Sequence, residues 1–233
     1  MTARISPEPD HFATCPVKGK ILDYYAGTFE AVFVLFHPFI RPVSISVDGY
    51  KTETFQVRAS LAATCQAVAW AEVTGLTGLP SYSAIDIGLR TSIGALNQQA
   101  ASPQFAEALE LLEQRHGIVA PCEGRFSDLL HDLILDGFQR VGHQWAWVGD
   151  EFGTQRTLYW IDDLKTGDRE LTDGTQSIFA ADKSLLYTTH WDSHFSFLCG
   201  SQSVLETLVN WLSLEGFFCT PDTGIDWSLA ELR

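Results

Sequence analysis

The sequence predicts an α+β fold in which a mostly helical N-terminal half packs on a C-terminal antiparallel sheet with one or two flanking helices. Apolar residues at helical spacing dominate residues 53–141, whereas residues 143–219 contain short runs rich in aromatic and β-branched residues. One further helical segment, opened by Ser203, interrupts this second region. Because helices and strands are segregated along the chain and do not alternate, an antiparallel sheet is expected.

The composition indicates one folded unit. The chain has 233 residues, of which 45% are hydrophobic and 12% aromatic, so it can bury a sizeable core and is too apolar for a disordered protein. Residues 1–20 contain three prolines and show no periodicity, which predicts a flexible arm. Residues 21–233 are expected to form a single α+β domain, with a helical subregion at about 53–141 and a sheet subregion at about 143–219.

The first half of the chain offers one buried run and several helices. Residues 29–36 are continuously apolar, as in a buried strand or a short core helix. Residues 53–74 are Ala-rich and predict a helix that stops at Gly75. Three further segments predict helices: 81–99, where small residues such as Gly88 would let a neighbouring helix approach closely; 103–116, with Ser102 as N-cap and Gly117 as stop; and 128–141, after Ser127.

The second half reads as hairpins. Residues 145–148 and 156–161 flank a loop rich in Gly and Asp, which is typical of a β-hairpin. Residues 177–180 and 185–199 predict further β structure. Ser203 and Glu206 have the spacing of a capping box that opens a helix, and residues 217–219 predict a last edge strand.

The charge of the chain excludes some classes of partner. The formal net charge is −14 and the pI about 4.7, so the protein would repel nucleic acid. Residues 125–233 carry 17 acidic and 7 basic groups, against 12 and 8 in residues 1–124, so the negative field belongs to the C-terminal part. Such a field would steer a basic partner there; the alternative is that it only keeps the protein in solution.

Cysteine usage and the apolar runs bear on the compartment. Five cysteines without any C-x-x-C spacing argue against a disulfide framework or structural zinc. The N-terminus lacks the pattern of a signal peptide, and the longest apolar run, residues 31–40, is too short to span a bilayer. A cytoplasmic protein is therefore expected, with no membrane association and no bound cofactor.

The strongest candidate for chemistry is the stretch 188–199, because two histidines and an aspartate interrupt an apolar run. On a straight strand His190, Asp192 and His194 would point to the same face and form a facial triad for a divalent metal. A strand covering residues 185–199 would greatly exceed the usual length of about five or six residues, so the chain is expected to turn inside it.

The position of that turn decides between two arrangements. A two-residue turn at residues 192–193 would place His190 opposite Phe195 and send the two histidines to opposite faces. A three-residue loop of residues 192–194 would pair Trp191 with Phe195, uniting these rings with Tyr187 on one apolar face. We favour the three-residue loop, which leaves the metal site less favoured than a locally hydrogen-bonded turn.

Three other residues are weak catalytic candidates. Cys199 lies near the histidines and would be a nucleophile if one of them acted as base, although a buried inert thiol is favoured. Asp150 and Glu151 could join Asp162 and Asp163 in a carboxylate cluster at one end of the first hairpin, with solvated loop residues as the favoured alternative.

Several segments resemble a bacterial family catalogued as domain of unknown function 2711. The resemblance rests on HQWAWVGDEFGT (143–154), LYWIDDL (158–164) and TTHWDSHFSFLC (188–199), with a weaker echo at residues 37–39, and it would cover most of residues 35–229. The family implies a bacterial, cytosolic protein. It assigns no activity or catalytic residue.

Two functions follow from these observations. The first is a non-enzymatic, acidic interaction module that binds a protein partner through its C-terminal sheet and loops, with Asp162, Asp163 and Trp191 as candidate contacts; the partner could be a basic toxin that it neutralises, as an immunity protein does. The alternative is a metal-dependent hydrolase in which His190, Asp192 and His194 hold the ion and Asp150 or Glu151 is the base.

Overall fold

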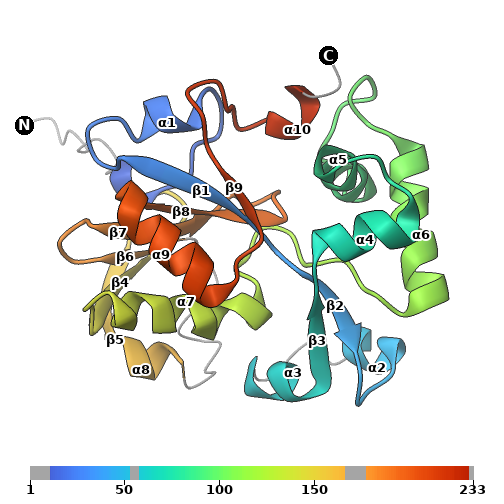
Figure 1. The fold of residues 1–233 in the computed structure, drawn as a ribbon, viewed down its shortest axis with the longest axis horizontal. Coiled ribbons are helices and arrows are strands. Elements are labelled where there is room, and N and C mark those ends of the chain that lie inside the picture. Colours follow the sequence, from blue (N-terminus) through green and yellow to red (C-terminus); the bar gives the residue numbers. More distant parts are fainter. Residues whose placement is uncertain (1–10, 53–57, 166–176, 231–233) are drawn as a thin grey trace, which may run out of the picture.

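The computed structural model describes residues 11–52, 58–165 and 177–230 and confirms the α+β class. A seven-stranded sheet forms the body of the protein, and a separate two-stranded sheet lies beyond one of its ends (Figure 1). The large sheet has the order β5-β4-β6-β7-β8-β1-β9, and each neighbouring pair is antiparallel. Its strands are β1 (Ala31–Phe36), β4 (Trp145–Gly149), β5 (Arg156–Trp160), β6 (Ser177–Ala180), β7 (Leu185–Thr189), β8 (Phe195–Gly200) and β9 (Gly216–Phe218).

Helices gather on both sides of this sheet. In Figure 1, α7 and α9 lie together against one face, whereas α4, α5 and α6 form a group beyond the same end of β1 as the two-stranded sheet. The helices are α1 (Ile21–Tyr24), α2 (Val47–Thr52), α3 (Arg58–Thr64), α4 (Trp70–Thr77), α5 (Tyr82–Ser92), α6 (Pro103–His116), α7 (Asp128–Arg140), α8 (Ile161–Leu164), α9 (Gln202–Leu212) and α10 (Trp227–Ala230).

Strand β1 shows why its sequence is apolar without alternation. It lies between β8 and β9, and all six of its residues are buried. Phe33 and Leu35 face the core under α7 and α9, whereas Val32 and Val34 face the core under α1, α4 and α5. A strand covered on both faces needs apolar side chains at every position. The N-terminal half thus contributes an interior strand to the sheet as well as helices.

The predicted helix over residues 53–74 is wrong. Residues 53–57 lie outside the described residues, and the rest is divided into α3, the strand β3 (Cys65–Val68) and α4. β3 pairs with β2 (Phe39–Pro42), and the buried side chains of Cys65 and Val68 anchor it. A tertiary pairing has overridden the helix propensity of the alanines. The stop is also later than expected, because the left-handed residue after α4 is Gly78.

Helix caps were predicted with mixed success. The hydroxyl oxygen of Ser102 accepts a hydrogen bond from the Phe105 amide, and Gly117 ends α6 in the left-handed conformation, as predicted. Helix α9 instead begins two residues earlier than the capping box suggests, since Ser201, and not Ser203, accepts from the Val204 amide.

The predicted flexible arm falls partly outside the described residues. Part of this segment is packed: Phe12 and Ala13 are buried, and the Phe12 ring meets Phe179 edge-on at 5.0 Å between centroids. The division into an arm and a single domain stays a prediction. Within the described ranges, no helix has the length and apolar character needed to cross a bilayer.

Close contact between α5 and α6 depends on Gly88. A Cβ atom there would lie 2.9 Å from Leu109 Cδ1 and 3.0 Å from the Phe105 carbonyl carbon and oxygen. The helices therefore approach as closely as the sequence predicted for this position.

Gly88→Ala should destabilise the protein by about 1–3 kcal/mol, because the backbone of Phe105 cannot move away from the added methyl group. Gly75→Ala is the matched control, since a Cβ at this position in α4 meets no atom within 4 Å and alanine favours a helix. Urea denaturation of the two variants measures the difference. Equal stabilities would contradict the close approach.

Candidate functional site

The chain turns between β7 and β8, and the register of these strands settles the question of loop length. Thr189 pairs with Ser196 and the pairing ends there, so residues 190–194 form the loop, with Trp191 and Asp192 at the centre of its hydrogen-bonded turn. The favoured three-residue loop is wrong: Trp191 does not pair with Phe195, and it is 55% exposed. Tyr187 packs on one face of the sheet and Phe195 on the other. The prediction failed because it assumed a single apolar face, whereas both faces are covered.

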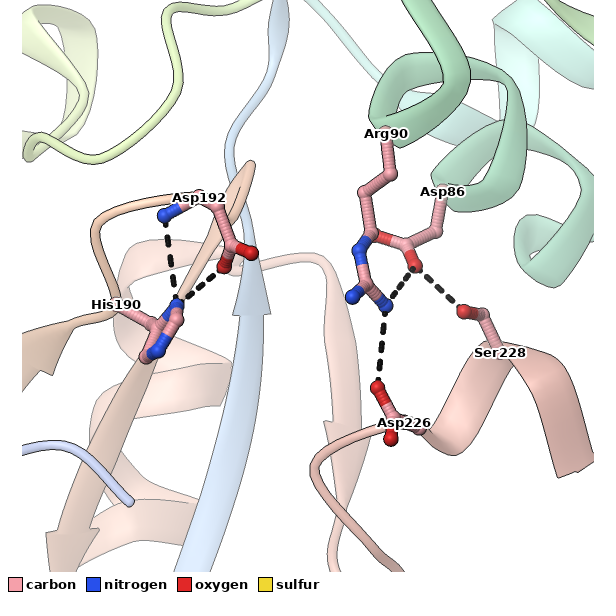
Figure 2. Close-up of polar contacts among 6 residues, drawn as sticks. All are labelled: Asp86, Arg90, His190, Asp192, Asp226 and Ser228. Atoms are coloured by element: carbon pink, nitrogen blue, oxygen red, sulfur yellow. Dashed lines mark hydrogen bonds and ion pairs between the residues drawn. The ribbon is translucent and has the colours of Figure 1, made fainter. Parts of the chain in front are cut away.

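The turn itself is fixed by a contact between a histidine and an aspartate. The Asp192 carboxylate bonds to Nδ1 of His190 (Figure 2). The Ser193 amide donates to the His190 carbonyl at 3.1 Å. The two side chains are only 10% and 15% exposed. Burial alone would raise the pKa of Asp192, but the hydrogen bond and charge of His190 outweigh burial and lower the pKa below 3.8.

Two buried histidines lie behind the turn. The His37 amide donates to the His194 carbonyl at 3.1 Å, and His37 Nε2 lies 2.6 Å from the Ser196 hydroxyl oxygen. Burial, followed by the neighbouring His194, lowers the pKa of His37 to about 3. Burial, followed by the positive charge of Arg90, lowers the pKa of His194 to about 4. Both imidazoles are therefore neutral at physiological pH, and Nδ1 of each is buried without a hydrogen-bond partner.

A polar network on α5 faces the turn from across the sheet end (Figure 2). The Ser228 hydroxyl donates to Asp86 Oδ2 at 2.6 Å, and Arg90 Nη1 lies 3.4 Å from Asp226 Oδ1 and 4.0 Å from Asp86 Oδ2. These contacts hold the C-terminal segment around α10 against α5. Burial raises the pKa of Asp86 to about 6, although Ser228 and Arg90 oppose the rise.

The sequence analysis missed Asp86 and Arg90. A signal was present, because Asp86 lies between Ile85 and Leu89 within the predicted helix, and its partner Arg90 follows four residues later. A carboxylate surrounded by the apolar residues of a buried helix face is either paired or functional.

The geometry bears on the metal prediction. Among the residues that the structure describes, no group of three or more His, Cys, Asp or Glu side chains is placed to hold a metal ion. His190 and Asp192 contact each other. His194 is buried apart from them, beside His37. The metal-dependent alternative gains no support from this arrangement and stays a prediction. What the arrangement offers is an imidazole oriented by a carboxylate, the geometry that acid–base catalysis requires.

Cys199 lies in the core and not in a site. Its side chain is fully buried, and burial, followed by the nearby Cys219 and Cys15 thiols, raises the pKa of Cys199 well above its usual value. A thiol that stays protonated is a poor nucleophile.

The predicted carboxylate cluster does not form. Asp150 and Glu151 lie in the loop between β4 and β5, whereas Asp162 and Asp163 belong to α8 at the opposite end of β5. Asp150 accepts hydrogen bonds from the Thr154 amide at 2.8 Å and the Thr154 hydroxyl at 2.5 Å, as a turn-capping residue does. The separation follows from the hairpin, since one strand length divides the two pairs.

An acidic groove of about 610 Å³ opens between α5, α6 and the segment of residues 120–123. His194 is among its lining residues, and no lysine or arginine is among those that the structure describes. The Glu113 carboxylate is paired with Lys51 at 2.6 Å. The acidic lining residues are Glu107, Glu110, Glu113 and Glu123, and the apolar ones include Leu89, Ile93, Ala106 and Leu109.

The backbone of Trp191 contacts the segment that carries Glu123, one of the lining residues of the groove. The Gly124 amide donates to the Ser193 carbonyl at 3.0 Å, and a Cβ on Gly124 would lie 2.1 Å from the Trp191 carbonyl oxygen. The turn therefore sits directly on the segment that carries Glu123. Of the three predicted partner contacts, only Trp191 is near the groove, because Asp162 and Asp163 lie at the other end of the sheet.

These features define an acidic α+β protein built on a seven-stranded antiparallel sheet, with a buried polar network at one end of the sheet. Residues 17–229 match the family described as "Protein of unknown function (DUF2711)", and the chain belongs to this family. The comparison with curated proteins and the comparison with solved structures gave no match.

Asp86→Asn should stabilise the protein at neutral pH. The folded-state pKa is about 6 against the usual 3.8, so the folded state binds more protons between these values, and its stability falls by about 3 kcal/mol as the pH rises through them. Asparagine keeps an acceptor for Ser228 and removes the buried charge. Urea denaturation at about pH 7.5 should show a gain of about 1–3 kcal/mol.

At about pH 5, between the two pKa values, this gain should fall to about half, and it should disappear only below the usual pKa of 3.8, where the carboxyl is protonated in the unfolded chain as well. Asp23→Asn, which removes an exposed carboxylate on α1, controls for the change in net charge. A loss of stability at neutral pH would instead mean that the ionised pair of Asp86 and Arg90 stabilises the fold.

Acidification should destabilise the protein through His37 and His194. Unfolded, both bind a proton near pH 6.5, whereas folded they do so only at about 3 and about 4, so stability is fully present above pH 6.5 and is lost below it. By pH 4.5 each histidine lowers the free energy of unfolding by about 3 kcal/mol. Protonation of Asp86 over the same range raises it by about 2 kcal/mol. Denaturation midpoints across this range measure the loss. His37→Gln should reduce the pH dependence, whereas His116→Gln, at an exposed position, should leave it unchanged.

Proposed function

We propose that this protein is a non-enzymatic binding module that holds a basic segment of a protein partner in the groove between α5 and α6. The observation that carries the proposal is the charge of the groove: four glutamates line it, and no lysine or arginine is among its described lining residues. The net charge of −14 adds a long-range field that would steer a positively charged partner towards the protein.

The groove is suited to lysine or arginine side chains in particular. Glu107, Glu110 and Glu123 are exposed, so their carboxylates can meet the charged heads of such side chains. Leu89 and Leu109 form part of the apolar wall, against which the aliphatic stems would pack. The charged head and the aliphatic stem of a lysine or arginine side chain therefore each meet a matching surface. A free metal ion or a small anion would not match both surfaces.

Trp191 supplies an anchor at the edge of the groove. An exposed tryptophan beside a charged groove is a frequent centre of binding energy in protein interfaces. The interaction surface then consists of the β7–β8 turn from the C-terminal sheet and of α6 from the N-terminal half. An immunity-like role, in which the partner is a basic toxin, is one form of this function. This role requires a bacterial, cytoplasmic protein, and we include that setting in the proposal.

A labelled amphipathic peptide of about 15 residues, built from lysine and leucine, serves as the probe. Fluorescence anisotropy should show binding that weakens with salt, and Glu107→Lys should weaken it about tenfold. Glu206→Lys on α9 is the matched control, because it makes the same change in charge on an exposed position outside the groove.

The proposal fails if Glu206→Lys weakens binding as much as Glu107→Lys, since the effect would then reflect net charge and not the groove. It also fails if a peptide with glutamate in place of lysine binds equally well. Trp191→Ala should weaken binding without changing the salt dependence, because the ring carries no charge.

A further inference from the structure

A second, larger pocket lies on the other side of α5 and has no part in the proposed function. Its volume is about 860 Å³, within the range of small-molecule sites. The walls come from α4, the start of α5, β9, the loop of residues 220–224 and α10. Four aromatic side chains line it on one side, and Thr220, Asp222 and Thr223 line it on the other.

Aromatic rings form the main wall of this pocket. The centroid of Phe36 lies 5.2 Å from that of Tyr82, 5.9 Å from that of Phe217 and 5.6 Å from that of Trp227. Trp70 stacks on Phe36 from behind at 4.3 Å, with the planes 9° apart. The rings are held by one another and by the core, so the wall is formed before any ligand arrives, which reduces the entropy lost on binding.

Asp222 is the charged residue among the described lining residues of the pocket, and its side chain is 91% exposed. The hydroxyl oxygens of Thr220 and Thr223 lie 3.1 Å apart, and Asp222 stands between these residues in the sequence. Lys20 is not a described lining residue, but its ammonium bonds to Asp222 Oδ1 at 2.8 Å. The Asp222 carboxylate therefore already binds a cationic group, the ammonium of Lys20.

We propose that this pocket binds a small aromatic amine. The ring of the ligand packs against Phe36, Tyr82, Phe217 and Trp227, where offset and edge-to-face contacts with aromatic side chains are favourable. Its ammonium group lies towards Asp222 and the threonine hydroxyls, and the electron-rich faces of the rings add to the attraction for a cation. An aromatic carboxylate would meet Asp222 with the wrong charge.

Gly75 offers a way to block the pocket without disturbing the fold. It lines the pocket, and a Cβ added there meets no atom within 4 Å. Gly75→Leu therefore places a side chain in open space of the pocket, and leucine favours the helix in which it stands. Gly75→Ala adds only one methyl group and is the matched control.

Isothermal titration calorimetry with tryptamine and with indole-3-acetate tests the proposal, because these probes share a ring and differ in the sign of their charge. Wild-type protein and Gly75→Ala should bind tryptamine within twofold of each other, and Gly75→Leu should bind it at least about tenfold more weakly. Indole-3-acetate should bind at least about tenfold more weakly than tryptamine. Thermal unfolding of each variant verifies that it is folded.

Two substitutions test the charge separately from the shape. Asp222→Asn should weaken the binding of tryptamine, whereas Lys20→Gln should strengthen it by removing the competing ammonium group. Neither should change the binding of uncharged indole. The proposal is overturned if tryptamine gives no binding heat up to millimolar concentration, if Gly75→Leu binds it as well as Gly75→Ala does, or if indole-3-acetate binds equally tightly. None of these results depends on the acidic groove.

Discussion

Burial of both faces of the four neighbouring strands β6, β7, β8 and β1 is the constraint on which the rest of the structure depends. Every residue of β1 and β8 is buried, and so is every residue of β6 and β7. A sheet of this kind cannot place polar side chains on a solvated face, so its polar residues must find partners inside the protein or collect where the strands end. Ser196 illustrates the first solution, since its hydroxyl group meets His37 within the core.

The buried polar network at the sheet end is the second solution. Arg90 is the cation that balances Asp86 and Asp226, and its charge also reaches Asp192 and His194. Such an arrangement contributes little net stability, because desolvation of the charges offsets most of their attraction. Its effect is positional: it fixes α10 against α5, and thereby fixes one wall of the aromatic pocket.

Local patterns predicted most elements of this fold, and long-range pairing explains the failures. Helix α6 was predicted at both ends, and the close approach at Gly88 was anticipated, because caps and small residues act over a few neighbours. β3 was read as helix because its partner strand lies more than twenty residues earlier in the chain. The site was harder still: the role of Asp86 depends on Ser228, and no local pattern connects residues so far apart.

The two proposed binding surfaces share α5 and differ in what they can attract. Tyr82 at the start of the helix lines the aromatic pocket, and Leu89 near its end lines the acidic groove. Asp86 lies between them and Arg90 directly follows Leu89, and the charge of Arg90 reaches His194, which lines the groove. When Asp86 is ionised, Asp86 and Asp226 together offset the charge of Arg90. Arg90 then adds little positive potential to the groove. When Asp86 binds a proton, near pH 6, that balance is lost, and the interior becomes more positive beside His194. In the proposed function, protonation of Asp86 should therefore weaken the attraction of the groove for a basic segment, although this carboxyl group is buried and the groove glutamates are on the surface.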